Sequence, residues 1–171
     1  MGQPDKTDPK ICVVVQTDAS REGVAGILGQ YDGEGKARPI SFAARTCNKV
    51  ESKYPIIELE ALAVTFALNR FEPYIMGLRL IVETDHAALV PMFKNPKECG
   101  SPRVNKWAMS VTSKFPELDI QYKPGESNAN ADALSRAFSP QTQECVITDL
   151  PEGTESIKRL PSVTRLEWIG A

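Results

Sequence analysis

Apolar runs separated by turn-forming residues fill the first part of the chain, and their lengths predict three strands. The run ICVVVQTD at residues 11–18 is rich in β-branched side chains, as expected for a central strand buried on both faces. GVAGILGQY at 23–31 and ARPISFAAR at 37–45 predict two more strands. The DGEGK segment between them favours a tight hairpin turn, because Asp-Gly suits the backbone of such turns. Three antiparallel strands in succession are therefore the simplest arrangement.

A longer apolar segment from Pro55 to Phe71 predicts a helix that is covered on most of its sides. Pro55 suits the first turn of a helix, and Pro73 is expected to end it. The apolar residues occur nearly all round this helix: Ile56, Ile57, Leu59, Leu62, Val64, Phe66 and Leu68.

Strands and helices alternate over the rest of the chain. LRLIVET at 78–84 predicts a fourth strand that ends at Asp85, and Leu118–Tyr122 predicts a fifth. Further helices are expected at His86–Phe93, Arg103–Phe115 and, after a KPGES turn, Asn128–Ala137. The approximate order is βββαβαβα. Since a strand–helix–strand connection implies parallel neighbours, we predict an α/β fold with a five-stranded mixed sheet flanked by helices.

One domain accounts for most of the chain. Of its 171 residues, 42% are hydrophobic, which suffices for a single core that we place at residues 10–137. Residues 1–9 are polar and are expected to be loose, and 138–171, with three prolines among scattered Ser, Thr and Glu, read as a linker or loosely docked extension. No apolar run approaches the roughly 20 residues of a membrane helix, and no signal peptide is visible, so we expect neither membrane insertion nor secretion.

Charge is distributed unevenly along the chain, although its formal net value is only −2. Residues 10–137 carry 16 basic and 15 acidic residues, and four of these acids are candidate metal ligands. Segment 94–114 is the most basic stretch, and a phosphate backbone would be attracted there. An ordinary solvated helix face explains the same charges equally well.

Zinc chemistry is disfavoured by the spacing of the possible ligands. The four cysteines lie far apart without a CxxC pair, and His86 is the only histidine. We expect reduced thiols and an intracellular setting. The cysteines are Cys12, Cys47, Cys99 and Cys145.

Four carboxylates in four local settings are the candidate chemistry: Asp18, Glu60, Asp85 and Asp132. The first three follow or interrupt apolar runs, where a bare carboxylate is costly to bury. Four converging acids would repel one another unless a hard divalent cation joined them, which suggests a two-metal phosphodiester site. Asp18 and Asp85 would lie together if their strands are parallel neighbours, whereas each acid taken alone is better explained as a strand-end turn former.

The long helix contains two glutamates, Glu58 and Glu60, which lie about 200° apart around its axis and cannot share a face. Glu60 lines up with Val64 and Ala67, a stripe of small residues that would let the helix approach the sheet closely. Glu58 is expected at the surface. Of the two, Glu60 is therefore the predicted ligand.

Several motifs, in this order, carry a resemblance to a known family. They are TDAS at 17–20, PISFAARTCNKVESKYPIIELEALAVTFAL at 39–68, TDHAAL at 84–89 and YKPGESNANADALSR at 122–136. Over about residues 10–137 the chain resembles the ribonuclease H domain of reverse transcriptases from gypsy-type LTR retrotransposons. The resemblance implies an RNase H-like fold in which Asp18, Glu60, Asp85 and Asp132 are the catalytic, metal-binding acids.

The resemblance also implies an activity and its partners. The family cleaves the RNA strand of RNA–DNA hybrids with two Mg²⁺ ions, which Mn²⁺ can replace, and leaves 5′-phosphate and 3′-hydroxyl ends. The expected partners are the hybrid and the polymerase domain of the same polyprotein, within a cytoplasmic virus-like particle. Since 171 residues cannot also hold a polymerase, residues 138–171 would lead toward the next polyprotein module.

Substrate-binding positions are weaker expectations, because a surface or packing role suits each of them as well. One departure from cellular and retroviral members is that residues 123–131 contain no histidine before Asp132. Tyr122 or Lys123 occupies that neighbourhood instead. The candidate substrate-binding residues are Ser20, Arg21, His86, Arg103, Lys106 and Tyr122.

Three other readings stay open at this point. A degenerate RNase H-like connecting module would be expected to lose the carboxylates, all four of which are present here. A transposase or resolvase of the same fold would space its acids differently. A host protein domesticated from such an element would retain the same motifs.

Overall fold

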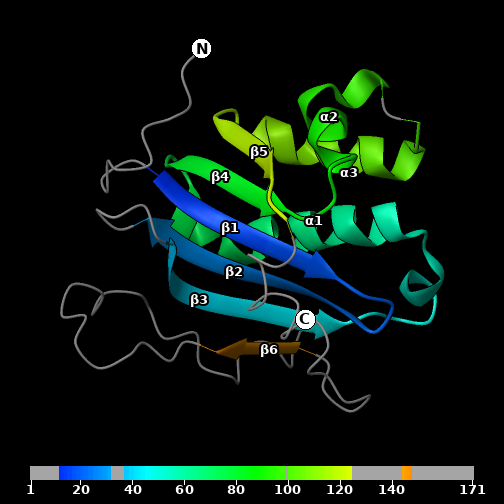
Figure 1. The fold of residues 1–171 in the computed structure, drawn as a ribbon, viewed down its shortest axis with the longest axis horizontal. Coiled ribbons are helices and arrows are strands. Elements are labelled where there is room, and N and C mark those ends of the chain that lie inside the picture. The colour runs from blue at the N-terminus through cyan, green and yellow to red at the C-terminus, as the bar shows by residue number, and fades with distance from the viewer. Residues whose placement is uncertain (1–11, 32–36, 99, 125–143, 148–171) are drawn as a thin grey trace.

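A computed structural model of the chain describes residues 12–31, 37–98, 100–124 and 144–147, which form a mixed sheet with helices packed on it (Figure 1). The strand order is β5-β4-β1-β2-β3-β6. The strands are β1 Cys12–Ala19, β2 Gly23–Tyr31, β3 Ala37–Thr46, β4 Arg79–Thr84, β5 Leu118–Tyr122 and β6 Glu144–Ile147. The helices are α1 Ile56–Ile75, α2 Leu89–Lys94 and α3 Pro102–Lys114, with 3₁₀ turns at Glu51–Lys53 and Pro96–Glu98.

All five predicted strands form, and the α/β fold with a mixed sheet is confirmed. β1 runs antiparallel to β2 and parallel to β4, and β4 runs parallel to β5. A sixth strand, β6, was not predicted; it pairs antiparallel with β3, from Phe42 opposite Ile147 to Arg45 opposite Glu144. The predicted final helix at Asn128–Ala137 and the segment 1–9 lie outside the described residues.

Helix α1 passes the expected stop at Pro73 and ends at Ile75. Proline removes one helical hydrogen bond, but Phe71 and Ile75 on either side of it are 1% and 0% exposed. Their burial holds this last turn against the sheet. The short helix expected from His86 begins only at Leu89, because a turn closed by the Leu89 N–H on the His86 carbonyl comes first.

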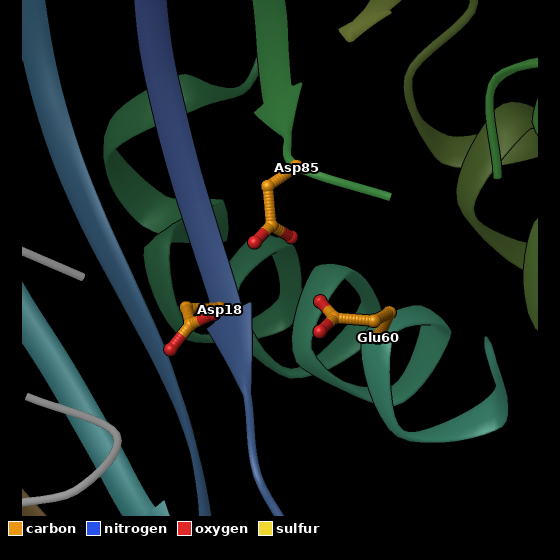
Figure 2. Close-up of side chains that lie close together, drawn as sticks. All are labelled: Asp18, Glu60 and Asp85. Atoms are coloured by element: carbon orange, nitrogen blue, oxygen red, sulfur yellow. The ribbon is translucent and has the colours of Figure 1, made fainter. Parts of the chain in front are cut away.

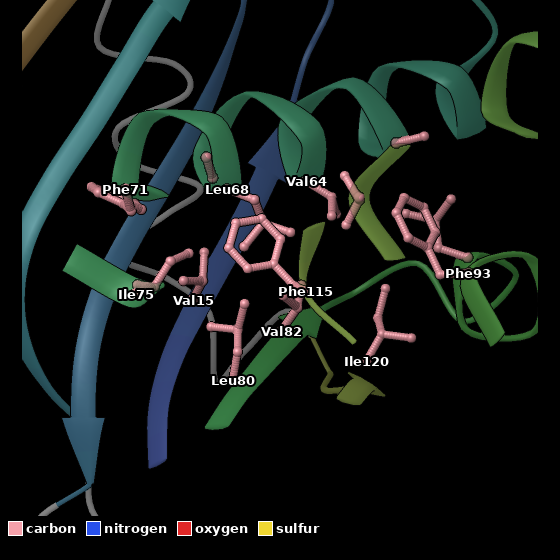
Figure 3. Packing of buried hydrophobic residues seen from close by; sticks show 14 of the residues in the cluster. Val15, Val64, Leu68, Phe71, Ile75, Leu80, Val82, Phe93, Phe115 and Ile120 are labelled. Carbon is pink, nitrogen blue, oxygen red and sulfur yellow. The ribbon is translucent and has the colours of Figure 1, made fainter. Parts of the chain in front are cut away.

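The main core lies between α1 and the sheet (Figure 3), where Val64 and Leu68 of the helix face Val15 and Val82 of the strands. α3 packs beside α1, and α2 packs against α3 and β5. Among the described residues, no helix is both long and apolar enough to cross a membrane.

The small-residue stripe on α1 brings the helix close to β2, as predicted. A Cβ added at Gly26 would lie 2.5 Å from the Cβ of Ala67, a separation that no real pair of these atoms tolerates. The absence of a side chain at Gly26 therefore permits the approach. This contact sets how far Glu60, on the same stripe, stands from the ends of the strands.

Candidate metal centre

Three carboxylates from three elements converge at one edge of the sheet (Figure 2). Asp18 lies in β1, Asp85 directly follows β4, and Glu60 projects from α1 toward both. Each offers an oxygen within 4.8 Å of the others. Because β1 and β4 are parallel neighbours, with Thr17 opposite Thr84, their carboxyl ends meet there. The predicted convergence of Asp18, Glu60 and Asp85 is what the structure shows; Asp132 lies outside the described residues and stays a prediction.

Burial makes this cluster electrostatically costly. Asp18 and Glu60 are 6% and 4% exposed, and Asp85 is half-buried. Two ionised carboxylates at such a separation repel each other by about 3 kcal/mol at an effective dielectric constant of about 20. Burial first, then the charges of Asp85 and Asp18, raises the pKa of Glu60 to about 9, against the opposing hydrogen bond from the Ala19 N–H. Without a cation, Glu60 is therefore protonated at neutral pH.

One atom of the cluster indicates a missing partner. Glu60 Oε2 is buried and has no hydrogen-bond partner among the described residues. Buried polar atoms are nearly always satisfied, so an orphaned carboxylate oxygen beside two other carboxylates suggests a cation. Oxygen atoms on opposite sides of an octahedral Mg²⁺ lie about 4.2 Å apart, close to the span of this cluster. The all-oxygen donor set fits Mg²⁺ or Mn²⁺.

Glu58 takes no part in this cluster, as the helical spacing predicted. Its carboxylate accepts a hydrogen bond from Ser101 Oγ at 2.9 Å and forms an ion pair with Arg103. The Arg103 guanidinium also lies over the Tyr54 ring, 4.0 Å from its centroid. Arg103 thus joins the start of α3 to the start of α1. Its predicted contact with substrate stays a prediction.

Ser20 and Arg21 lie in the turn that follows β1, next to Asp18. Ser20 Oγ accepts hydrogen bonds from the N–H groups of Gly23 at 3.1 Å and Glu22 at 3.2 Å, which closes the turn. Arg21 is exposed beside it. Ser20 therefore shapes this turn, and substrate contact by either residue is still a prediction.

The remaining candidates lie on β4, β5 and α3. His86 is half-buried directly after Asp85, and its N–H donates to Thr84 Oγ1 at 3.2 Å. Tyr122, at the end of β5, is 53% exposed. Because β4 and β5 are parallel, His86 and Tyr122 share the edge of the sheet that holds the acids. Lys106 is exposed on α3.

Sequence reasoning missed a further buried carboxylate, Glu83, which lies in β4 two residues before Asp85. It is 3% exposed and hydrogen-bonded to Gln16, Tyr31 and Lys123. Its signal was present in the run LRLIVET, since a glutamate within a buried strand requires partners.

Comparison with known proteins gives the chain its family. Residues 8–113 match the family described as RNase H-like domain found in reverse transcriptase. The Pol polyproteins of the Drosophila melanogaster transposons opus and gypsy are 37% identical over 140 residues and 33% identical over 121 residues. These matches cover 81% and 70% of this chain, but only 13% and 11% of the polyproteins.

Solved structures show the same fold at low sequence identity. RNase H1 from Halobacterium salinarum has a TM-score of 0.58 at 16% identity, covering 72% of this chain and 93% of its own. LC11-RNase H1, in a complex with an RNA/DNA hybrid, has a TM-score of 0.56 at 17% identity, with 73% and 93% covered. Sequence and fold agree, and the chain belongs to the family of RNase H-like domains found in reverse transcriptases, as the RNase H domain of a retrotransposon Pol.

Proposed function

We propose that this domain hydrolyses the RNA strand of RNA–DNA hybrids in a reaction that depends on divalent cations. The observation that carries the proposal is the orphaned, buried Glu60 oxygen beside Asp18 and Asp85. A module that merely connected other domains would gain nothing from bringing three mutually repelling acids together, two of them buried. Family membership and a structural neighbour crystallised with an RNA/DNA hybrid also support the proposal.

The proposed cofactor is a pair of Mg²⁺ ions, with Mn²⁺ as a substitute. Bound metal would supply an activated water and charge stabilisation for in-line hydrolysis, leaving 5′-phosphate and 3′-hydroxyl ends. Asp18 is held within β1, and the Ala19 N–H orients Glu60 toward it. Asp132 is the proposed fourth ligand.

Asp85 and Glu60 are expected to contribute differently to metal binding. Asp85 is the most accessible of the three and can approach an ion with least rearrangement. Glu60 must lose a proton before it can bind, because its pKa is about 9 in the cation-free protein. Metal affinity is therefore expected to fall as the pH is lowered.

The setting proposed for this activity is reverse transcription of a retroelement. The chain spans 13% and 11% of the length of the opus and gypsy polyproteins. We propose a polymerase domain of the same polyprotein as its partner and a cytoplasmic virus-like particle as its location.

A substrate panel tests the proposal. The chain, in excess over the substrate, is incubated with Mg²⁺ and an end-labelled RNA–DNA hybrid, RNA duplex or DNA duplex. We expect cleavage of the hybrid alone, because the family distinguishes duplexes by shape and 2′-hydroxyl groups. Asp85→Asn should abolish cleavage, and Glu58→Gln, which alters a glutamate outside the cluster, should retain it. Equal cleavage of all three duplexes, or full activity of Asp85→Asn, would contradict the proposal.

A further inference from the structure

Glu83 is the buried centre of a polar network that joins three strands of the sheet and the residue that follows a fourth. Its carboxylate accepts hydrogen bonds from Gln16 Nε2 at 2.8 Å, from Lys123 Nζ at 2.7 Å and from the Tyr31 hydroxyl. Gln16 belongs to β1, Tyr31 to β2 and Glu83 to β4, while Lys123 follows β5. Burial alone would raise the pKa of Glu83, but the bonds from Gln16, Lys123 and Tyr31 hold it below its ordinary value. Glu83 is thus a carboxylate whose partners lie within the chain.

The network lies next to the metal centre, on the same face of β1 and β4 and earlier along both strands. Gln16 and Glu83 are opposite each other in the parallel β1–β4 pair, and Thr17 and Thr84 form the next pair. Asp18 is two residues beyond Gln16, and side chains two residues apart project from the same face of a strand. Asp85 is likewise two residues beyond Glu83. The Gln16–Glu83 hydrogen bond therefore ties the two strands together two residues before the acids.

Lys123 holds the end of β4 from the other side. Its backbone N–H donates to the Thr84 carbonyl at 2.8 Å, which extends the β4–β5 ladder beyond the pair of Tyr122 with Thr84. Its side chain reaches back to Glu83, the residue before Thr84. Lys123 therefore contacts both residues that precede Asp85, Thr84 through its backbone N–H and Glu83 through its ammonium group.

We propose that Glu83 and Lys123 are positioning residues, which hold the ends of β1 and β4 in register so that Asp18 and Asp85 converge with Glu60 at cation-binding distance. The cluster acids repel one another, and the Asp85 backbone lies just past the last residue of β4. Ties on both sides of β4 resist that repulsion. Neither Glu83 nor Lys123 belongs to the acid cluster, so each acts through the strands. This inference rests on the proposed metal-dependent function.

The test is to titrate the metal-free full chain with Mn²⁺ alone and to measure the binding affinity by calorimetry. We expect Glu83→Gln and Lys123→Met to weaken Mn²⁺ affinity by about tenfold, as loss of outer partners typically does at metal sites. Lys123→Arg, which keeps the cation, should stay within about threefold of the unmutated chain. In hybrid cleavage, an Mg²⁺ concentration about tenfold higher should restore the rate of Lys123→Met, because the substitution impairs metal binding and not substrate recognition.

A matched control separates positioning from general stability. Ile75→Val removes a buried methyl group at the far end of α1 from Glu60, which lowers stability without touching the strand ends. Its Mn²⁺ affinity should be unchanged. Because the Lys123 side chain is 27% exposed, its variants are expected to fold even where Glu83→Gln does not.

The outcomes are distinguishable. Unmutated affinity in both Glu83→Gln and Lys123→Met would overturn the inference, as would an equal loss in Ile75→Val. A chain that binds no Mn²⁺ before any substitution would overturn the proposed metal-dependent function itself, and this inference with it. A defect in Lys123→Met that Lys123→Arg shares would also contradict the inference, because the ammonium–carboxylate tie would then be irrelevant.

Discussion

Replacing Glu60 with glutamine should stabilise the metal-free protein at neutral pH while removing its response to metal. The pKa of Glu60 rises from an ordinary value of 4.5 to about 9, because the carboxyl group is buried beside Asp85 and Asp18. Between these two pH values, the folded protein holds a proton that the unfolded chain has released. Stability associated with Glu60 is thus fully present below about pH 4.5 and is lost as the pH rises toward 9.

The size of this stability difference follows from the raised pKa of Glu60. Each pH unit between these pKa values removes about 1.4 kcal/mol from the free energy of unfolding. At pH 7, about 2.5 units above the ordinary value, the loss is about 3 kcal/mol. A glutamine has no proton to lose, and its amide oxygen can still accept the hydrogen bond from the Ala19 N–H. The free energy of unfolding of Glu60→Gln should therefore exceed that of the unmutated chain by almost nothing at pH 4.5 and by about 3 kcal/mol at pH 7. The difference at pH 7 corresponds to roughly 6 to 12 °C in Tm.

The assay is urea unfolding of both proteins in a chelator at several pH values, repeated with Mg²⁺. Metal should stabilise the unmutated chain by mass action but leave Glu60→Gln unchanged. Glu58→Gln is the matched control: it alters a glutamate on the same helix whose partners are Ser101 and Arg103. A Glu60→Gln advantage that does not vary with pH, or one that Glu58→Gln shares, would refute the reasoning.

Four further predictions concern packing, metal choice and two basic side chains of α3. Gly26→Ala should lower the free energy of unfolding in urea by roughly 1 to 3 kcal/mol, since its methyl group would overlap that of Ala67, and Ala67→Gly should recover part of the loss. Ca²⁺ should raise the Tm of the chain without supporting hybrid cleavage, because its flexible coordination does not reproduce the geometry of Mg²⁺; efficient cleavage in Ca²⁺ would count against the proposed site. Lys106→Ala should weaken hybrid binding and reduce the slope of log affinity against log salt by about 1, as expected for one lost phosphate contact. Arg103→Ala should instead lower stability, because Arg103 already pairs with Glu58, and an unchanged unfolding curve would contradict that role.

Local patterns were sufficient to predict most of the acid cluster. Uninterrupted apolar runs identify β1 and β4 as buried central strands, and parallel pairing follows from the helix between them. The sequence therefore predicts that Asp18 and Asp85 lie together on the condition that their strands are neighbours, and the pairing of β1 with β4 meets that condition. The angular spacing of a helix separates Glu58 from Glu60, because residues two apart face nearly opposite directions.

Interactions between distant segments could not be predicted in this way. β6 pairs with β3 over only four residues, from a part of the sequence rich in proline and polar residues. Nothing local to Glu83 indicates that its partners come from β1, β2 and the end of β5. Likewise, Arg103 reads as a free basic side chain until the fold places Glu58 and Tyr54 against it. In each case the partner is chosen by tertiary packing.

Single-turnover cleavage of an RNA–DNA hybrid tests the central claim most directly, with the full chain in excess and Mg²⁺ varied. The account predicts cuts in the RNA strand alone, 5′-phosphate and 3′-hydroxyl ends, a rate that saturates with Mg²⁺, and no cleavage by Asp18→Asn or Asp85→Asn. Cleavage that persists in a chelator, or that survives both substitutions, would contradict the claim that Asp18, Glu60 and Asp85 form a metal centre for hydrolysis.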